Sequence, residues 1–310
     1  MTSSQPAVVV VGSCNMDLVT RAPRLPLPGE TLTGSSFGTY LGGKGLNQAV
    51  AARRMGANVA MIGKVGADDF GARVRAALEE EAIAAQGLSL DHEQPTGAAL
   101  ILVEEQRGEN SIVVVPGANG ALTPADVDRA ADLIRGARVV LLQLEIPLAT
   151  TVHAAQLAHE AGCVVVLTPA PAQPLPDALL ALTDVLLPNV VELAQVQDAG
   201  AELEPEQGAR ALLARGCGAV IVTLGRQGAL LVTPHALHAQ PAFPVTAVDT
   251  VGAGDALAGA IGALLAEGLE LSAALRYACA AGALAVTKSG ALPALPTRAA
   301  VEALLGSAAG

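Results

Sequence analysis

A run of small residues that ends in a carboxylate is the clearest chemical signal in the sequence. Residues 249–255, DTVGAGD, follow a strand-like stretch, Pro244–Val248, and precede a predicted helix, Ala256–Ala266. Backbone N–H groups of small residues at a helix start can approach an anion closely, and the helix dipole favours negative charge there. A carboxylate in the first turn can instead take a proton from a hydroxyl that attacks a phosphoryl group. Asp255 is therefore a candidate general base, although an ordinary turn in which Asp255 favours the dipole has the same pattern.

A second glycine-rich run, residues 42–49 (GGKGLNQA), opens a predicted helix, Asn47–Met55. It comes close to a Walker A loop, but Gly45 stands where the hydroxyl that ligates Mg²⁺ is required, and we expect no apolar strand before it. A P-loop nucleotide site is therefore disfavoured. Two interpretations remain open: a glycine-lined pocket in which Lys44 and Asn47 face a polar ligand, or a helix start that is rich in glycine for packing.

Polar and acidic side chains follow two predicted strands. Asn15 and Asp17 come after the strand Ala7–Val11, and Glu145 follows the strand Val139–Leu144. In an extended backbone Asn15 and Asp17 point to the same side, and ligands of open α/β sheets bind at the carboxyl ends of the strands. Loop solvation or helix capping could explain each carboxylate alone. Together they predict a site that accepts hydrogen bonds from the hydroxyls of a polyol.

Two further segments follow predicted buried strands. Asn189 and Glu192 lie three residues apart at a helix start, so both can face one point and could hold hydrated Mg²⁺ near phosphates. A capping pair is the alternative for these two residues. Residues 223–228 follow the strand Ala219–Thr223 and predict either a nucleotide contact or a turn.

The elements that must position these residues alternate between strand and helix. Such alternation predicts βαβ units and a largely parallel sheet that is covered by helices on both faces, with a single domain over residues 1–310. The other expected strands are Ala57–Ile62, Val164–Leu167 and Val185–Leu187, and the other expected helices are Asp69–Glu81, Pro124–Ile134, Pro147–Ala161 and Pro205–Arg215.

Two stretches interrupt this alternation, and we expect them to form a small β lid from about residues 17–41 and 96–116. Ala98–Glu104 and Ser111–Val115 are expected to pair as antiparallel strands around a polar turn at residues 106–110. Proteins usually cover the edges and apolar faces of a small projecting sheet. The lid therefore predicts a homodimer contact.

Composition excludes several classes of partner. The chain has 18 Lys and Arg against 29 Asp and Glu, a net charge of −11, which disfavours a nucleic-acid partner, and aromatic residues make up only 2%. No apolar run reaches the roughly 18–20 residues of a membrane span, and the N-terminus lacks a basic and apolar leader. The four cysteines have no metal-site or disulfide spacing. We predict a cytoplasmic protein with no membrane or nucleic-acid partner.

Taken together, the motifs resemble the ribokinase family of carbohydrate kinases, the PfkB group. Residues 42–47 and 249–255 are similar to the two signatures of that family, in the right order and at the expected separation, and the likeness runs nearly end to end, from Val8 to about Pro296. Shorter stretches that support it are residues 12–17, 28–31, 117–119, 143–147 and 169–172.

The resemblance implies a ribokinase-like three-layer α/β/α fold with a small β lid, and ATP-dependent phosphorylation of D-ribose at the 5-hydroxyl to give ribose 5-phosphate. Asp255 matches the catalytic base of the family, and Gly252, Ala253 and Gly254 match its anion hole. The positions that match sugar contacts are Asn15, Asp17, Gly43, Lys44, Gly45, Asn47, Glu145 and Asp255. The positions assigned to the nucleotide and its Mg²⁺ are Asn189, Glu192, Thr223, Leu224, Gly225, Arg226, Gln227, Gly228, Gly254 and Cys279.

The resemblance also implies a monovalent-cation site, normally for K⁺, and a homodimer contact through the lid. The positions that match the cation site are Asp249, Val251, Ala285, Lys288, Gly290 and Ala294. Ala294 lacks a hydroxyl that relatives carry, and Cys279 stands where many relatives have His near the adenine.

Two other functions remain open. A sister kinase could act on fructose, a deoxy-sugar acid, a nucleoside or a sugar phosphate, but Asp17 and Glu145 favour a neutral polyol because carboxylates repel an anionic sugar. A sugar-binding regulator with an inactive kinase fold is the other alternative. The presence of Asp255, of the glycines before it and of Asn189 argues against that alternative.

Overall fold

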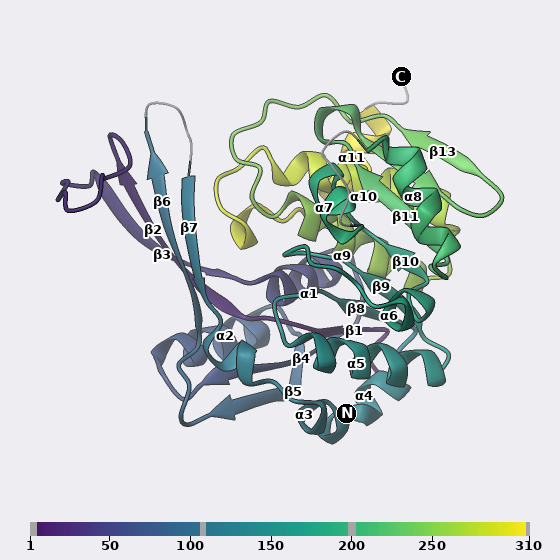
Figure 1. Cartoon of the computed structure of the whole chain (residues 1–310), viewed down its shortest axis with the longest axis horizontal. Helices are drawn as coiled ribbons and strands as arrows, with labels where there is room; N and C mark the ends of the chain where they lie inside the picture. Colours follow the sequence, from purple (N-terminus) through teal and green to yellow (C-terminus); the bar gives the residue numbers. More distant parts are fainter. Residues whose placement is uncertain (1–4, 106–109, 198–202, 308–310) are drawn as a thin grey trace.

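The computed structural model describes residues 5–105, 110–197 and 203–307, which form a large sheet and a smaller one (Figure 1). The strands of the large sheet are β1 (Val8–Val11), β4 (Val59–Gly66), β5 (Ala84–Asp91), β8 (Val139–Leu142), β9 (Val164–Leu167), β10 (Val185–Leu186), β11 (Ala219–Thr223), β12 (Ala229–Val232) and β13 (Leu237–Gln240). They lie in the order β13-β12-β11-β10-β9-β8-β1-β4-β5. All neighbouring strands from β5 to β11 in this order pair in parallel, whereas β12 and β13 are antiparallel additions. The predicted, largely parallel α/β sheet is confirmed.

The strand β1 illustrates why this sheet is buried on both faces. Val8 and Val10 belong to one hydrophobic cluster, Val9 and Val11 belong to the other, and all four are fully buried. Successive strand residues point to opposite faces, so an unbroken run of valines suits a sheet that helices cover on both sides. The three layers expected from the sequence are therefore present.

The helices divide between the two faces (Figure 1). The first cluster includes residues of α1 (Lys44–Arg54), α2 (Asp69–Glu80), α9 (Ala253–Ala266), α10 (Leu271–Ala285) and α11 (Arg298–Ser307). The second includes residues of α3 (Pro124–Arg129), α4 (Ala131–Arg135), α5 (Leu148–Glu160), α6 (Asp177–Ala181), α7 (Val190–Val196) and α8 (Pro205–Ala214). Short 3₁₀ turns lie at Gly117–Ala121, Gly225–Gln227 and Leu292–Ala294.

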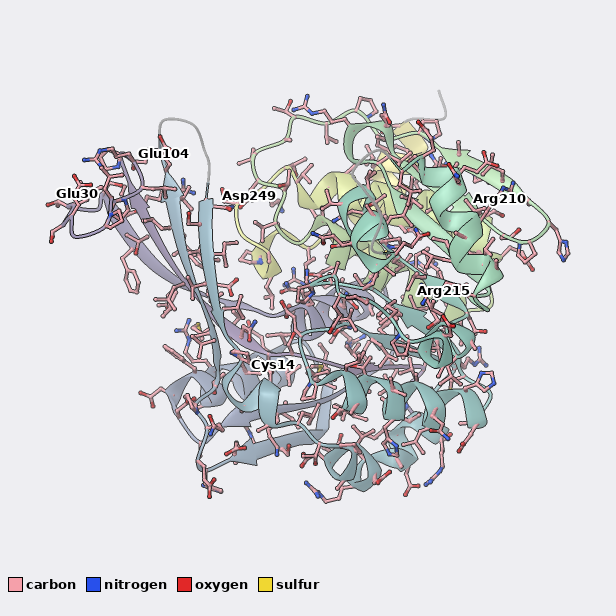
Figure 2. All side chains as sticks on the ribbon, viewed as in Figure 1. Cys14, Glu30, Glu104, Arg210, Arg215 and Asp249 are labelled. Atoms are coloured by element: carbon pink, nitrogen blue, oxygen red, sulfur yellow. The ribbon has the colours of Figure 1, made fainter. Side chains whose placement is uncertain are left out.

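The small sheet consists of β2 (Asn15–Ala22), β3 (Ser36–Gly42), β6 (Gly97–Glu104) and β7 (Asn110–Val115), in the order β3-β2-β6-β7. It projects to one side of the molecule in Figure 1, and Figure 2 shows Glu30 at its outer end, where the carboxylate pairs with Arg24. The antiparallel pairing expected of β6 and β7 is confirmed. Of the polar turn predicted between them, residues 106–109 lie outside the described residues.

Several predicted boundaries are wrong, and glycine accounts for two of them. Helix α1 begins at Lys44 instead of Asn47, and α9 begins at Ala253 instead of Ala256. Glycine has a low helix propensity, so the glycines near these two helix starts led us to predict both starts too late. In the structure Gly43 and Gly252 occupy the N-cap positions.

Three other expectations differ from the structure. The strand β3 leads directly into α1, where no strand was expected. The sequence did not indicate this strand because it has few β-branched residues and a weak alternating pattern. The stretch predicted as a strand at Pro244–Val248 forms no strand. The single helix predicted over Pro124–Ile134 is interrupted at Ala130. None of the helices in the described residues is long and apolar enough to span a membrane.

Candidate active site

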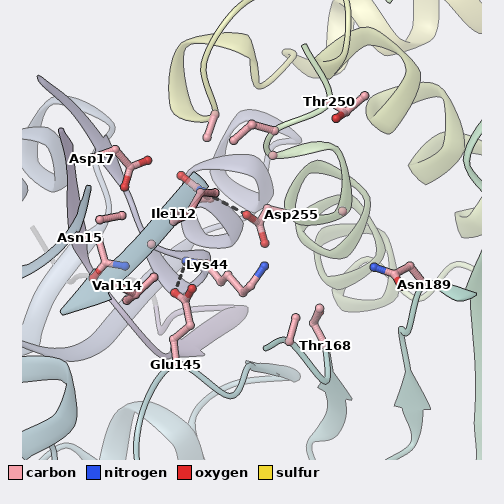
Figure 3. A pocket seen from close by; sticks show the side chains of 18 of the residues that line it. Asn15, Asp17, Lys44, Ile112, Val114, Glu145, Thr168, Asn189, Thr250 and Asp255 are labelled. Carbon is pink, nitrogen blue, oxygen red and sulfur yellow. Dashed lines mark hydrogen bonds between the residues drawn. The ribbon is translucent and has the colours of Figure 1, made fainter. Parts of the chain in front are cut away.

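A cavity of about 410 Å³ lies where the small sheet meets the carboxyl ends of the parallel strands. We call it the acidic cavity, because Asp17, Glu145, Glu192 and Asp255 all line it. Figure 3 shows the Lys44 side chain between Glu145 and Asp255, with Asp17 and Asn189 at opposite ends of the view. The structure brings together these predicted site residues: Asn15, Asp17, Gly43, Lys44, Asn47, Glu145, Asn189, Glu192, Thr223, Val251, Gly252, Gly254 and Asp255.

Asp255 lies in the first turn of α9 and is almost fully buried. The side-chain amide of Asn47 donates to its Oδ2 at 3.0 Å, and the amide of Gln48 donates to its Oδ1 at 3.0 Å. Burial raises the pKa of Asp255, while Lys44 and the two amides oppose that rise. A buried carboxylate whose oxygens both face hydrogen-bond donors is held in one orientation, as a general base requires.

The backbone before Asp255 has the conformation predicted for an anion site. Gly252, the N-cap residue of α9, has a φ of +80°, and a Cβ atom there would lie 3.0 Å from the Cα of Ala291. Glycine adopts this left-handed conformation without strain. The backbone N–H of Ala253 donates to the carbonyl oxygen of Thr250 at 3.4 Å, so the N–H groups that this helix start offers to an anion are those of Gly254 and Asp255. Gly252, Gly254 and Asp255 all line the acidic cavity.

Lys44 provides positive charge among the carboxylates. Burial lowers the pKa of its ammonium group, but the charges of Asp255, Glu145 and Glu192 outweigh burial, and the pKa is raised. Lys44 is therefore a permanent cation in the physiological pH range. It can stabilise negative charge that passes through the cavity.

Two hydrogen-bond donors fix Glu145. The Ser13 hydroxyl donates to Glu145 Oε2 at 2.5 Å, and the backbone N–H of Lys44 donates to the same oxygen at 3.0 Å. Because both donors use Oε2, Oε1 is left to accept a hydrogen bond from a ligand.

Asn15 is fixed in the same way by Asn119. The Asn119 side chain accepts from the backbone N–H of Cys14 at 2.9 Å and donates to Asn15 Oδ1 at 2.7 Å. Since the Asn15 oxygen already accepts this bond, its NH₂ group is the end available to donate to a ligand.

Asp17, on β2, faces the cavity from the small sheet (Figure 3). Its carboxylate lies close to Gly42 of β3, where a Cβ atom would be 2.4 Å from Asp17 Oδ2. Burial, followed by the charges of Glu145 and Asp255, raises the pKa of Asp17 to about 6. Asp17 is thus an ionised hydrogen-bond acceptor at neutral pH that becomes protonated in mild acid.

A second cavity, of about 710 Å³, adjoins the acidic cavity. Thr223, Thr250, Gly254 and Leu257 line both, so the two form one continuous cleft. The other predicted site residues that line the second cavity are Gly225, Arg226, Gly228, Ala253 and Cys279.

Asn189 and Glu192 form the capping arrangement that the sequence left open. The Asn189 side chain accepts from the Glu192 backbone N–H at 2.8 Å, and Glu192 Oε2 accepts from the Asn189 backbone N–H at 2.9 Å. Both residues also line the acidic cavity, and burial raises the pKa of Glu192. Capping occupies one carboxylate oxygen and leaves the other free to bind a water molecule of a hydrated cation.

Asp249 connects two segments beside α9. Its carboxylate oxygens accept from the backbone N–H groups of Val251 at 3.0 Å and Gly290 at 2.9 Å. The backbone N–H groups of Val248 and Asp249 both donate to the carbonyl oxygen of Val286. The predicted cation-site segments around residues 249–251 and 285–290 are therefore neighbours in space.

Some predicted site residues lie outside both cavities. The backbone N–H of Gly45 donates to the Ser13 hydroxyl at 3.3 Å, which favours the packing interpretation for this glycine. The others that line neither of the two cavities are Leu224, Gln227, Asp249, Ala285, Lys288, Gly290 and Ala294.

The structure also adds residues that the sequence did not single out. Thr168 follows β9 and lines the acidic cavity, so the strand-end argument applied to Glu145 could have found it. Alternation along β6 and β7 could have indicated the apolar inner face of the small sheet, which lines the same cavity with Ala99, Ile101, Ile112 and Val114. No simple motif marks the residues of the second cavity at positions 242–247.

Known proteins are similar to this chain over nearly its whole length. The model of the pfkB family of carbohydrate kinases matches residues 5–298. The chain is 40% identical over 303 residues to a ribokinase of Bacillus subtilis, an alignment that covers 96% of this chain and 99% of that protein. It is 36% identical over 293 residues to a deoxyribokinase of Salmonella typhi, with coverage of 94% and 95%.

A solved structure is similar over almost the whole chain. The structure of Arabidopsis thaliana ribokinase complexed with ribose and ATP matches with a TM-score of 0.90 at 33% identity, covering 97% of this chain and 98% of that chain. The family resemblance seen in the two glycine-rich motifs is thereby confirmed. The chain belongs to the pfkB family of carbohydrate kinases.

Proposed function

We propose that the protein transfers the γ-phosphoryl group of ATP to the 5-hydroxyl of D-ribose, giving ribose 5-phosphate and ADP. The observation that carries this proposal is the buried Asp255 carboxylate at the start of α9, held by two side-chain amides inside a cavity lined by further hydrogen-bonding groups. A neutral polyol suits this cavity because its hydroxyls can donate to carboxylates without charge repulsion.

The acidic cavity supplies the groups that would hold the sugar. Glu145 and Asp17 offer carboxylate oxygens, and Asn15 offers an NH₂ group whose orientation Asn119 sets. Fixed donors and acceptors discriminate strongly among sugars, because a missing hydroxyl leaves a buried polar group without a partner. The relatives named ribokinase, including the one solved with ribose and ATP, support ribose as the substrate.

The second cavity would hold ATP, with its γ-phosphate directed toward Gly252 and Gly254 at the shared boundary. Asp255 takes the proton of the 5-hydroxyl as that oxygen forms a bond to the γ-phosphorus. The bond from phosphorus to the bridging oxygen breaks, and ADP leaves with its electron pair. The amides at the start of α9 and the Lys44 ammonium stabilise the charge on the transferred group.

Magnesium fits this arrangement as a nucleotide-bound ion. Among the described residues no group of three or more His, Cys, Asp or Glu side chains could hold a metal. Mg²⁺ keeps several waters and is often bound by phosphates with one or two carboxylates. Glu192 and Asn189 would contact its water molecules, and the ion would neutralise phosphate charge during transfer.

We also propose that a monovalent cation such as K⁺ activates the enzyme from a site beside Asp249. Asp249 joins the segments at Val251 and Gly290, and a cation between them would fix the carbonyls there and thereby the amides of residues 252–254. Turnover should therefore respond more than ribose affinity. Equal initial rates in potassium, sodium and tetramethylammonium at one ionic strength would contradict this role.

The small sheet would act as a lid over the sugar and as a dimer contact. Its outer face exposes the apolar side chains of Phe37, Leu100, Val113 and Val115, and β7 is an unpaired edge among the described strands. A second copy would cover both features. Light scattering at micromolar concentration should give twice the chain mass of 30.9 kDa, and a monomer would contradict the contact.

A coupled ADP-release assay over a panel of acceptors tests the proposed substrate. We expect the highest kcat/KM with D-ribose, lower values with 2-deoxy-D-ribose and D-fructose, and very little activity with a nucleoside. A higher kcat/KM for any of the other three would assign the protein to a sister activity of the family. The absence of ADP release with every acceptor would favour the non-catalytic regulator.

A further inference from the structure

Two fully buried glutamines are connected to Asp255 by hydrogen bonds, and neither lines the acidic cavity or the second cavity. Gln48 follows Asn47 in α1, and Gln143 follows the last residue of β8. Burying two uncharged amides at the centre of a fold is costly unless their hydrogen bonds are made. Their position next to the candidate base suggests a role in the reaction.

The two side chains form a chain of hydrogen bonds that ends on Asp255. Gln48 Nε2 donates to Asp255 Oδ1 at 3.0 Å and to Thr168 Oγ1 at 3.3 Å. Gln143 Nε2 donates to Gln48 Oε1 at 2.6 Å. The Gln48 amide therefore uses both of its N–H donors and its oxygen.

This chain has only one favourable direction. An ionised carboxylate can only accept, so Gln48 must present its NH₂ group to Asp255. Gln143 supports that choice, because its own NH₂ group donates to the Gln48 oxygen. If Gln48 turned over, its oxygen would face the Asp255 carboxylate and its NH₂ group would face the Gln143 NH₂ group.

The same bonds define which part of the carboxylate is free to react. Gln48 occupies a lone pair of Oδ1, and Asn47 occupies a lone pair of Oδ2. Each oxygen retains a second lone pair, and Asp255 itself lines the acidic cavity. The Asn47 and Gln48 amides thus hold the carboxylate in one orientation. The lone pairs that remain to accept a proton are those to which these two amides do not donate.

We propose that Gln48 and Gln143 are positioning residues that orient the Asp255 carboxylate and keep it ionised for proton removal. This role rests on the proposed function of Asp255 as the general base. Gln48 acts directly on the carboxylate, and Gln143 acts only through Gln48. Neither residue touches the substrate.

The electrostatics of the site point the same way. Burial raises the pKa of Asp255, and the bonds from Asn47 and Gln48 lower it, because they stabilise the charged form. Without the Gln48 donor the carboxylate should bind its proton more tightly. The acidic limb of the kcat profile should then move to higher pH.

Replacement of each glutamine by methionine keeps the side-chain length and removes the donors. For Gln48→Met we expect kcat at pH 7 to fall by about 10- to 100-fold, the size of effect that misplacement of a catalytic group produces. The KM values for sugar and ATP should stay within about threefold, since the lost bond is not made to either ligand. Gln143→Met should lower kcat by a smaller factor, about 3- to 10-fold, because Gln48 can still reach Asp255 in part of the population.

The double variant separates positioning from general damage. Because Gln143 acts through Gln48, Gln143→Met should change kcat no further in a chain that already carries Gln48→Met. Thr150→Val is the matched control, since it removes another buried hydrogen bond, from Thr150 to the carbonyl of Leu122 at 2.8 Å, outside this chain of bonds. It should leave kcat and its pH profile unchanged.

The measurements are kcat, both KM values, the pH profile of kcat and the melting temperature of the wild type and all four variants. A kcat within about twofold of wild type and an unmoved acidic limb for Gln48→Met would overturn the proposal. Multiplicative losses in the double variant would also overturn it. If Gln48→Met does not fold, Gln143→Met decides the matter. A 3- to 10-fold fall in its kcat with unchanged KM values supports the proposal, and a kcat within about twofold of wild type overturns it.

Failure of the proposed function would look different. The variants are assayed with whichever sugar the wild type phosphorylates best, so an error in the ribose assignment leaves this test intact. A wild type that phosphorylates no sugar would remove the proposed function itself. An active wild type with unaffected glutamine variants would remove only the positioning role.

Discussion

The two cavities of the cleft differ in the kinds of residue that line them. The acidic cavity combines the apolar inner face of the small sheet with charged and amide side chains. Partners from distant parts of the sequence fix several of these polar groups, as with Ser13 and Glu145 or Asn47 and Asp255. The second cavity is lined mainly by small and apolar residues and by backbone, including Gly225, Gly228 and the segment at residues 242–247. Under the proposed function, sugar selection and proton transfer depend on the acidic cavity, whereas the second cavity provides a binding surface of matching shape for the nucleotide.

The largest effect should come from removing the base. Asp255→Asn keeps the size and most contacts of the side chain but cannot accept the proton, so kcat should fall by about 10²- to 10⁴-fold. Binding of D-ribose and of ATP, measured by calorimetry, should change little. A variant that retained more than about a tenth of wild-type turnover would show that Asp255 is not the base.

A smaller but selective loss should follow at the sugar contact on β2. Asp17→Ala removes an acceptor for a sugar hydroxyl, which costs about 1–3 kcal/mol and corresponds to a rise of about 5- to 150-fold in the KM for ribose. The KM for ATP should stay constant, because Asp17 does not line the second cavity in the described residues. An equal rise in the KM for ribose and the KM for ATP would show that the two cavities do not bind the two substrates separately.

The pKa of Asp17 allows the separation of sugar binding from ATP binding to be tested without replacing the side chain. Because this pKa is about 6, Asp17 is an anion above pH 6 and is increasingly protonated below it. Ribose affinity should therefore fall as the pH drops through 6, by up to about tenfold at pH 5, in step with the ionised fraction. Calorimetric titration with ribose alone measures this dependence, and Asp17→Asn is the control that should abolish it. An unchanged dependence in that variant would assign the titration to another group.

The smallest effect should come from the second cavity. Cys279 is buried and lines this cavity, and burial raises the pKa of its thiol to about 12, so it stays neutral. Cys279→Ala removes one apolar contact and should raise the KM for ATP by no more than about fivefold, with kcat and the KM for ribose unchanged. A large loss of kcat would mean that this half of the cleft takes part in the chemistry.

The sequence predicted those site residues whose side chains are carboxylates or amides. Asp255, Glu145 and the pair Asn15 and Asp17 were predicted because carboxylates and amides that gather at strand ends and a helix start can form a ligand site, although each one alone could also be a solvated or capping residue. The buried valine strands were equally clear, since a run such as Val8–Val11 fits a sheet covered on both faces.

What the sequence could not predict depends on contacts between distant residues. Gln48 and Asp255 are 207 positions apart, and Asn15 and Asn119 are 104 positions apart, so no local pattern relates them. The segment at Pro244–Val248 has the residue types of a strand but forms no strand in the structure. Residue type alone does not show whether such a segment joins a sheet or lines a cavity.

The central claim is that this cleft transfers a phosphoryl group to the 5-hydroxyl of D-ribose. Nuclear magnetic resonance of the product formed from uniformly ¹³C-labelled D-ribose and ATP tests it most directly. The account predicts a sugar phosphate whose phosphorus couples to carbon 5, together with one equivalent of ADP. Phosphorus coupled to carbon 1, or labelled ribose left unchanged while another sugar is phosphorylated, would contradict it.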